Sequence, residues 1–144
     1  MRAWRKICCP VDFSETSRRA AESALELAWA FDGQVTLVHV AEPLIAPALE
    51  GGARAAPSLE AIEPGLREEI RAWARALPGG EKVEVEVLLG SPPEETVRFA
   101  REHGCDAIVM GTHGRTGLKH LVLGSVAERV VRHAPCPVVV VRGE

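Results

Sequence analysis

Three glycines and a serine in the last third of the chain have a spacing suited to binding phosphate. Gly111 and Gly114 are separated by two residues, and nine more lead to Gly124, which Ser125 follows directly. Glycine allows positive φ angles and lets a phosphate approach backbone N–H groups closely. A helix starting at Ser125 would add about half a positive charge at its N-terminus. The pattern predicts an anion-binding loop, and an ordinary turn followed by a helix cap is the alternative.

Ser125 of this pattern, together with Asp12 and His113, has a side chain that could take part in chemistry. Ser125 and Glu128 have the spacing of a capping box, and the Ser125 hydroxyl could instead bind phosphate. Asp12 follows an apolar run and could accept a hydrogen bond from a ligand or cap a helix. His113 lies between the motif glycines and could act as a base, but no partner carboxylate is identifiable from the sequence. We therefore expect His113 to be a turn residue.

Alternating strands and helices must position these residues. Short apolar runs predict five strands, at residues 7–11, 35–40, 83–89, 107–110 and 138–141. The third of them alternates valine with glutamate, which indicates an edge strand with one face in water. Helical periodicity and capping residues predict four helices, at about residues 14–32, 58–77, 91–103 and 125–133. Because parallel neighbours need crossover connections, the pattern predicts one α/β domain over residues 1–144 with a parallel five-stranded sheet.

Ligands of open parallel sheets bind beyond the carboxyl ends of the strands, where the strand order reverses. If the order is 3-2-1-4-5, Asp12 and Gly111 flank that point. Both would then face one crevice.

Composition excludes several other classes of protein. The chain has 144 residues, 47% of them hydrophobic and 26% charged, with a net charge of -3. That charge disfavours nucleic-acid binding. No apolar run approaches the ~20 residues of a membrane helix, and the N-terminus lacks a secretory signal pattern. We expect a cytoplasmic protein with no nucleic-acid or membrane partner.

The four cysteines do not have the spacing of a zinc site or a redox pair. Cys8 and Cys9 are adjacent, while Cys105 and Cys136 are isolated. Adjacent residues of a strand point to opposite faces, which argues against a disulfide between the first two. We predict free thiols packed as small hydrophobic side chains.

The glycine pattern resembles the nucleotide-binding motif, G-x2-G-x9-G-[ST], of the universal stress protein family. Residues 7–14 (ICCPVDFS) resemble the first strand and loop of that family, and residues 37–40 (LVHV) and 134–141 (APCPVVVV) resemble its second and fifth strands. The similarity covers essentially the whole chain. It implies a Rossmann-like sheet of order 3-2-1-4-5 with helices on both faces, and the ATP-binding branch of the family. The stretch that corresponds to residues 41–58 is variable in that family, so the resemblance implies nothing about it.

The resemblance also implies a pocket for ATP formed by ten residues. On the adenine and ribose side these are Pro10, Val11, Asp12, Val40, Met110 and Gly111. On the phosphate side they are Gly114, Gly124, Ser125 and Val126. Asp12 would accept a hydrogen bond, and Val40 would meet the adenine through its backbone. A divalent ion, Mg²⁺ or Mn²⁺, would be carried mainly by the phosphates.

Two functions remain open at this point. The first is an ATP-binding stress-response protein that acts as a nucleotide-dependent regulatory module, and the alternative is a slow ATPase or phosphotransferase using Asp12 or His113. The P-loop pattern G-x-x-x-x-G-K-[ST] is absent from the sequence, and no residue stands out to orient an attacking water. Fast hydrolysis is therefore not expected. A flavin module is compatible with the fold, but aromatic residues make up only 4% of the chain, which leaves little to stack on the ring.

The last predicted strand indicates how the chain would associate. Val138, Val139, Val140 and Val141 form a short apolar run that would lie at a sheet edge. Such an edge invites pairing, and two copies related by a twofold axis would satisfy it. We expect a homodimer formed through this strand.

Overall fold

Five parallel strands form one sheet in the order β3-β2-β1-β4-β5. In the computed structural model, which describes residues 3–43, 58–112 and 123–143, the strands are β1 (Lys6–Pro10), β2 (Gln34–Ala41), β3 (Glu84–Leu89), β4 (Ala107–Gly111) and β5 (Val138–Val141). The predicted sheet and its order are confirmed. The end of each strand lies within one residue of the predicted end.

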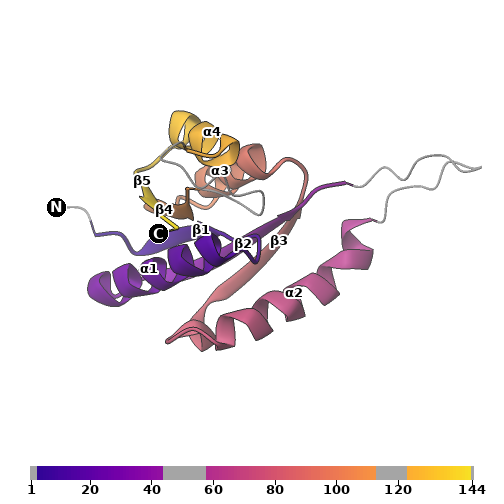
Figure 1. Ribbon diagram of the computed structural model, residues 1–144, viewed down its shortest axis with the longest axis horizontal. Helices are drawn as coiled ribbons and strands as arrows, with labels where there is room; N and C mark the ends of the chain where they lie inside the picture. Colours follow the sequence, from indigo (N-terminus) through magenta and orange to yellow (C-terminus); the bar gives the residue numbers. More distant parts are fainter. Residues whose placement is uncertain (1–2, 44–57, 113–122, 144) are drawn as a thin grey trace, which may run out of the picture.

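Two pairs of helices cover the two faces of the sheet (Figure 1). One face carries α1 (Glu15–Phe31) and α2 (Leu59–Arg75), and the other carries α3 (Pro92–Glu102) and α4 (Ser125–His133). A single 3-10 turn, η1 (Gly80–Lys82), precedes β3. Among the described residues, no helix has the length and apolar character needed to span a bilayer.

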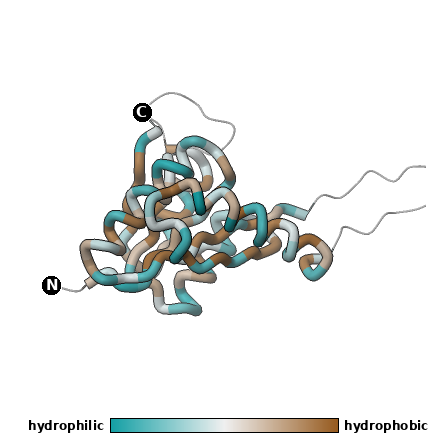
Figure 2. Tube along the Cα trace, turned by 90° about the horizontal axis from the view of Figure 1, so that it is seen from below, coloured by the Kyte–Doolittle hydropathy of each residue, from teal (hydrophilic) through white to brown (hydrophobic). Residues whose placement is uncertain are grey.

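The hydrophobic pattern explains which strands are central. Cys8 and Cys9 of β1 are both 0% exposed, and they belong to the cores on opposite faces of the sheet, as predicted. In the edge strand β3, Val85 and Val87 are buried whereas Glu84 is exposed. Figure 2 shows the hydrophobic segments gathered in the interior of the trace. A strand with two apolar faces can only be covered by helices on both sides.

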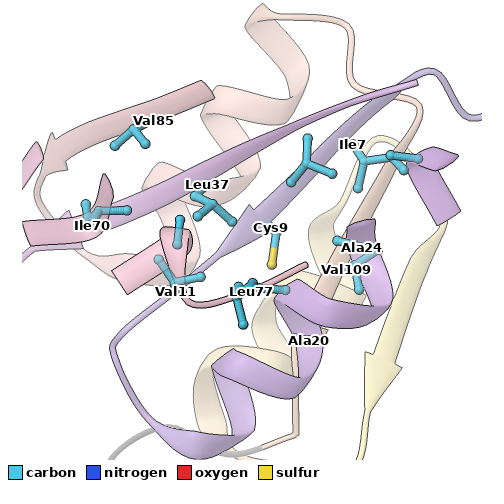
Figure 3. Packing of buried hydrophobic residues seen from close by; sticks show 14 of the residues in the cluster. Ile7, Cys9, Val11, Ala20, Ala24, Leu37, Ile70, Leu77, Val85 and Val109 are labelled. Atoms are coloured by element: carbon cyan, nitrogen blue, oxygen red, sulfur yellow. The ribbon is translucent and has the colours of Figure 1, made fainter. Parts of the chain in front are cut away.

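The core beneath α1 depends on small side chains. Ala20 and Ala24 of α1 are fully buried and lie close to the sheet, where Cys9 and Val109 face them (Figure 3). Larger side chains, including Ile70 of α2, fill the space beside them. This close approach places the start of α1 directly beside the carboxyl end of β4, at the edge of the sheet where the predicted site lies.

Serines begin three of the helices. The Ser14 hydroxyl accepts a hydrogen bond from the Ser17 N–H at 3.1 Å, and Ser58 does the same for Ala61 at 3.3 Å. Ser91 is the N-cap of α3, and Pro92 occupies the first helical position, as the sequence predicts. Because Ser14 caps α1, the alternative role of Asp12 as that cap is excluded.

Candidate functional site

A cavity of about 610 Å³ opens at the carboxyl ends of β1, β2 and β4. Residues of α3 and the N-terminus of α4 complete its wall. Nine of the ten predicted site residues line it, namely Pro10, Val11, Asp12, Val40, Met110, Gly111, Gly124, Ser125 and Val126. The tenth, Gly114, lies outside the described residues, as does His113. The fold therefore brings together residues that come from both ends of the sequence.

The chain turns sharply away from the sheet after β1. The Val11 N–H still donates to the Val38 carbonyl at 2.9 Å, but Phe13 has a φ of 67°, in the left-handed region that non-glycine residues rarely adopt. The Asp12 carboxylate accepts a hydrogen bond from the Ser14 N–H at 3.0 Å, which fixes its position at the mouth of the cavity. Strained backbone of this kind concentrates at functional sites.

His39 holds this turn against β2. Its Nδ1 lies 2.8 Å from the Val11 carbonyl oxygen, and since a carbonyl can only accept, Nδ1 is the donor. The imidazole packs on the Phe13 ring with a centroid separation of 5.1 Å. Phe13 in turn meets Trp73 of α2 edge-on at 6.0 Å. The His39 side chain is therefore hydrogen-bonded within the protein.

The backbone of Val40 faces the cavity because β1 ends before β2. In a strand, the N–H and C=O of alternate residues point to the same neighbour. The Val38 carbonyl points to the β1 side, where it accepts from Val11, and the Ala41 carbonyl points to the β3 side, where it accepts from Gly90 at 3.0 Å. The polar groups of Val40 therefore point to the β1 side, beyond Pro10, where β1 stops pairing.

Gly111 is required by packing as well as by its place in the cavity wall. A Cβ atom on Gly111 would lie 2.4 Å from the Thr16 Cγ2 and 3.1 Å from the Thr16 carbonyl oxygen. The first turn of α1 thus rests on the backbone of Gly111. Here the glycine is explained by the close approach of a helix, a reason that the motif alone did not indicate.

The N-terminus of α4 presents backbone N–H groups to the cavity. Gly124 is the N-cap, and its own N–H donates to the Thr112 carbonyl at 2.7 Å, while its carbonyl accepts from Glu128 at 2.9 Å. The next three N–H groups, of Ser125, Val126 and Ala127, have no intrahelical acceptor, and all three residues line the cavity. They are the groups available to an anion.

The predicted capping box at Ser125 is wrong. Ser125 is the first residue within α4, so its hydroxyl does not cap the helix, and the N-cap glycine has no side chain to do so. The physical reason is the Thr112–Gly124 hydrogen bond, which brings Gly124 into the half-helical position one residue earlier than the sequence pattern indicated. The Ser125 hydroxyl is thereby left at the cavity wall, and the Gly124 N–H is already used.

Ala127 and Thr96 are among the wall residues that sequence reasoning missed. Ala127 belongs to the wall through its backbone N–H, which only the true start of α4 reveals. Thr96 of α3 is 0% exposed beneath the cavity, and its hydroxyl finds no partner in the part of the chain that the structure describes. The sequence contained one signal that could have identified Thr96. It is a hydroxyl residue on the apolar stripe of a predicted helix, four positions after Pro92.

Electrostatic contacts hold α3 and α4 together beside the cavity. Glu94 of α3 pairs with Arg129 of α4. A hydrogen bond from Ser91 lowers the pKa of the Glu94 carboxyl, and the nearby charges of Arg129 and His133 lower it further. Glu94 is exposed, so the contribution of this pair to stability is small. This small stabilisation is fully present at pH values above the ordinary pKa of glutamate. It is lost as the pH falls through the lowered pKa of Glu94.

Metal binding by protein side chains alone is not supported by the arrangement. In residues 3–43, 58–112 and 123–143, no three His, Cys, Asp or Glu side chains are placed to hold an ion. The carboxylates that line the cavity are those of Asp12 and Glu42. A divalent ion at this site would take most of its ligands from a bound phosphate and from water, as Mg²⁺ commonly does.

Comparison with known proteins agrees with this geometry. The model of the universal stress protein family matches residues 3–142. The chain belongs to the universal stress protein family. A universal stress protein of Methanocaldococcus jannaschii is 40% identical, over 96% of this chain and 82% of the relative. Residues 111–125 carry the G-x2-G-x9-G-[ST] spacing on which the resemblance to this family rests.

Solved structures of the universal stress protein family share the fold. The universal stress protein UspA from Lactobacillus plantarum superposes with a TM-score of 0.78 over 99% of this chain and 100% of its own, at 23% identity. A universal stress protein from Archaeoglobus fulgidus, solved in complex with dAMP, has a TM-score of 0.63 and 29% identity over 97% of this chain and 99% of its own. The sheet order and helix arrangement are therefore those of the family.

Replacing Gly111 by alanine tests whether close packing requires the glycine. We expect Gly111→Ala to lower the free energy of unfolding by about 1–3 kcal/mol, because the added methyl overlaps Thr16. Adding Thr16→Ser, which removes the Cγ2, should restore part of that loss. Urea denaturation measures both.

The matched control for this substitution is Gly65→Ala in α2. A Cβ there meets nothing within 4 Å, so alanine should raise the stability by about 0.5–1 kcal/mol. If Gly111→Ala were as stable as the parent, the contact with Thr16 would not be the reason for the glycine.

Proposed function

We propose that the protein binds ATP in the cavity at the carboxyl edge of the sheet and acts as a nucleotide-dependent regulatory module in the stress response. The observation that carries the proposal is the set of three N–H groups at the start of α4, which open into a cavity of about 610 Å³. This volume lies within the range usual for small-molecule sites. The dAMP complex of the Archaeoglobus fulgidus relative supports an adenine nucleotide as the ligand.

The phosphates bind at the α4 N-terminus. The N–H groups of Ser125, Val126 and Ala127 donate to phosphate oxygens, and the Ser125 hydroxyl adds a further donor. The helix dipole favours negative charge at this position. The N–H of Gly124 is already hydrogen-bonded to the Thr112 carbonyl, so it is not a phosphate donor. The role of Gly124 is to let the phosphate approach the backbone closely, because it has no side chain. Gly114 is proposed as a second backbone donor, as the motif implies.

The adenine binds at the end of β2. The Val40 N–H and C=O, which point past the end of β1, form a donor–acceptor pair that matches the N1 acceptor and the N6 amino donor of adenine. Guanine presents the reverse pattern, a donor at N1 and an acceptor at O6, so it would leave both backbone groups unpaired. Pro10, Val11 and Met110 supply apolar contact to the base and the ribose, and Asp12 accepts a hydrogen bond from a ribose hydroxyl.

The arrangement favours binding over hydrolysis. His39 commits its Nδ1 to the Val11 carbonyl, and Asp12 holds the Ser14 N–H, so both side chains serve the structure of the turn. Mg²⁺ or Mn²⁺ would neutralise phosphate charge and travel with the nucleotide. Slow ATPase or phosphotransferase activity in the same pocket is the alternative that the first experiment below separates from binding.

We further propose that two copies associate through β5. The carbonyls of Pro137 and Val141 accept from β4 and from Thr112, so the polar groups of the alternate residues Val138 and Val140 point to the open edge. Pairing with the β5 of a second copy would satisfy these groups. The four cysteines are free thiols, which fits a reducing compartment, and we place the dimer in the cytoplasm.

The nucleotide carried by the purified protein tests the proposed function. We expect denaturation to release an adenine nucleotide, identified by chromatography, and we expect calorimetry to show ATP binding with Mg²⁺ and little response to GTP. Released phosphate in the same samples should stay far below the ~1–100 s⁻¹ of kinases. Turnover in that range would favour the enzyme, and absence of any nucleotide binding would overturn the proposal.

Two substitutions at Ser125 separate the backbone donor from the hydroxyl. Ser125→Ala removes the hydroxyl only, whereas Ser125→Pro also removes the N–H. Proline is well tolerated at the first helical position, and Gly124, with φ -62° and ψ 161°, already has the extended backbone that must precede it. We expect Ser125→Pro to bind ATP about 10- to 100-fold more weakly than Ser125→Ala. Equal affinities for a folded pair of variants would exclude phosphate contact with this N–H.

The dimer is tested at Val140, which lies in the edge strand outside both buried core clusters. Val140→Asp should produce monomers, because pairing would desolvate two carboxylates and bring like charges close to the twofold axis. Val140→Thr keeps the branched shape without the charge and should remain dimeric. Sedimentation velocity distinguishes the two states, and an unchanged profile for Val140→Asp would contradict edge pairing.

A further inference from the structure

Three of the four cysteines converge at the other end of the sheet from the nucleotide site. A second cavity, of about 370 Å³, opens where the chain enters β4 and β5. Cys105, which precedes β4, and Cys136, which precedes β5, both line it and are half-buried. Both pack against the core cluster that contains Cys8 of β1. These three residues, Cys8, Cys105 and Cys136, are called the thiol cluster below.

The members of the thiol cluster differ in how they reach solvent. Cys8 is 0% exposed, so its sulfur is reached only through its neighbours. Cys105 lines the cavity and packs against the core cluster that contains Cys8, and its thiol hydrogen-bonds with the Cys8 thiol. A small molecule that enters the cavity therefore meets Cys105 while a second thiol is in hydrogen-bond contact with it. This arrangement is what a sulfur needs in order to be oxidised and then to form a disulfide.

The hydrogen bond with Cys8 and the nearby charge of Lys6 favour the thiolate form at Cys105 over the other two cysteines. The hydrogen bond with Cys8 lowers the pKa of the Cys105 thiol, and the Lys6 ammonium group lowers it further, against the opposing charge of Asp106. The Asp106 carboxylate accepts from the N–H groups of Arg5 and Lys6 at 3.0 and 2.9 Å. The same hydrogen bond raises the pKa of Cys8 well above its usual range, and burial raises that of Cys136. The thiolate is the nucleophilic form of cysteine, so reactivity concentrates on Cys105.

We propose that Cys105 is an oxidation site for small hydroperoxides and that, once oxidised, it forms an intramolecular disulfide with Cys8. The proposal concerns the amino edge of the sheet and does not depend on nucleotide binding at the opposite edge. It assigns to Cys105 and Cys8 a role beyond packing, which their separation by 97 positions in the sequence concealed.

The chemistry balances with hydrogen peroxide as the oxidant. The Cys105 thiolate attacks one peroxide oxygen, the O–O bond breaks, and the other oxygen takes up a proton and leaves as water, which oxidises Cys105 to a sulfenic acid. The Cys8 sulfur then attacks the Cys105 sulfur, the S–O bond breaks, and the departing hydroxide takes the Cys8 proton to form a second water. Two thiols are oxidised to one disulfide while one peroxide is reduced to two waters.

The experiment treats the reduced full-length protein with hydrogen peroxide and follows its intact mass and free thiols. We expect the loss of two thiols and of two hydrogen atoms, reversed by dithiothreitol. Because Cys8 and Cys9 fall in one tryptic peptide, the bridge is mapped in the Cys9→Ala variant, where we expect Cys105 linked to Cys8. A bridge from Cys105 to Cys136, or no loss of thiols, would overturn the proposal.

Two adjacent residues give a matched pair of variants. Cys8 and Cys9 are both 0% exposed on β1 but face opposite cores, and burial raises the pKa of Cys9 to about 12. Cys9→Ala should form the disulfide like the parent, whereas Cys8→Ala should stop at a Cys105 sulfenic acid that dimedone traps. Cys105→Ser should retain all its remaining thiols. If Cys105→Ser lost thiols as fast as the parent, Cys105 would not be the oxidation site.

A second measurement needs no variant, and so does not depend on how well one folds. In the native parent protein, iodoacetamide should modify Cys105 several-fold faster than Cys136, although both line the same cavity. Equal rates at the two cysteines would show that Cys105 has no special thiolate character and would overturn the assignment.

Discussion

The early end of β1 is the constraint on which the proposed nucleotide site depends. β1 is the central strand, yet its pairing with β2 ends at the Pro10–Val38 register, whereas β2 continues to Ala41. The chain turns away from the sheet at Phe13, whose backbone is in the left-handed region. The space that a longer β1 would occupy becomes the cavity. Backbone polar groups that would have been paired within the sheet, those of Val40 above all, are directed into that space. Packing of Phe13 on His39 and Trp73 stabilises the unusual turn.

Thr112 connects the proposed phosphate end of the cavity to the edge of the sheet. Its N–H donates to the Val141 carbonyl of β5, and its carbonyl accepts from Gly124 at the start of α4. The position of the α4 N-terminus therefore depends on β5, the strand through which we propose that two copies associate. Two hydrogen bonds therefore link β5 to the N–H groups that we propose bind phosphate. In the proposed dimer, this short path would connect the ligand to the interface.

β1 also connects the two ends of the sheet. Cys8 is the middle residue of β1, two residues before Pro10, so the strand that ends at the proposed nucleotide cavity also carries the buried thiol of the thiol cluster. Parallel sheets carry ligands at their carboxyl edge, and the amino edge is ordinarily structural. Here the amino edge has a cavity lined by two thiols, with a third beneath it. The two edges thus carry different chemistry on the same central strand.

The sequence by itself determined the order of strands and helices and nine residues of the cavity wall. Strands β1 to β5 follow from apolar runs, and the starts of α1, α2 and α3 follow from serine caps, because both signals act within a few residues of the chain. The strand order and the site residues were available because residues 111–125 and 7–14 match a family pattern. Their convergence on one cavity is a consequence of the parallel topology, in which all carboxyl ends meet at one edge.

Only the tertiary structure decided which groups are available for chemistry. Gly124, and not Ser125, is the cap of α4, because the hydrogen bond from its N–H to the Thr112 carbonyl places it there, and the N–H groups without an intrahelical acceptor are accordingly those of Ser125, Val126 and Ala127. A glycine is needed at position 111 because Thr16 packs against its backbone, and the Cys105 thiol hydrogen-bonds with the Cys8 thiol. Each of these depends on a contact between segments at least eleven residues apart, and often about a hundred. Local periodicity and turn chemistry carry no information about such distances, which are set by how the helices pack on the sheet.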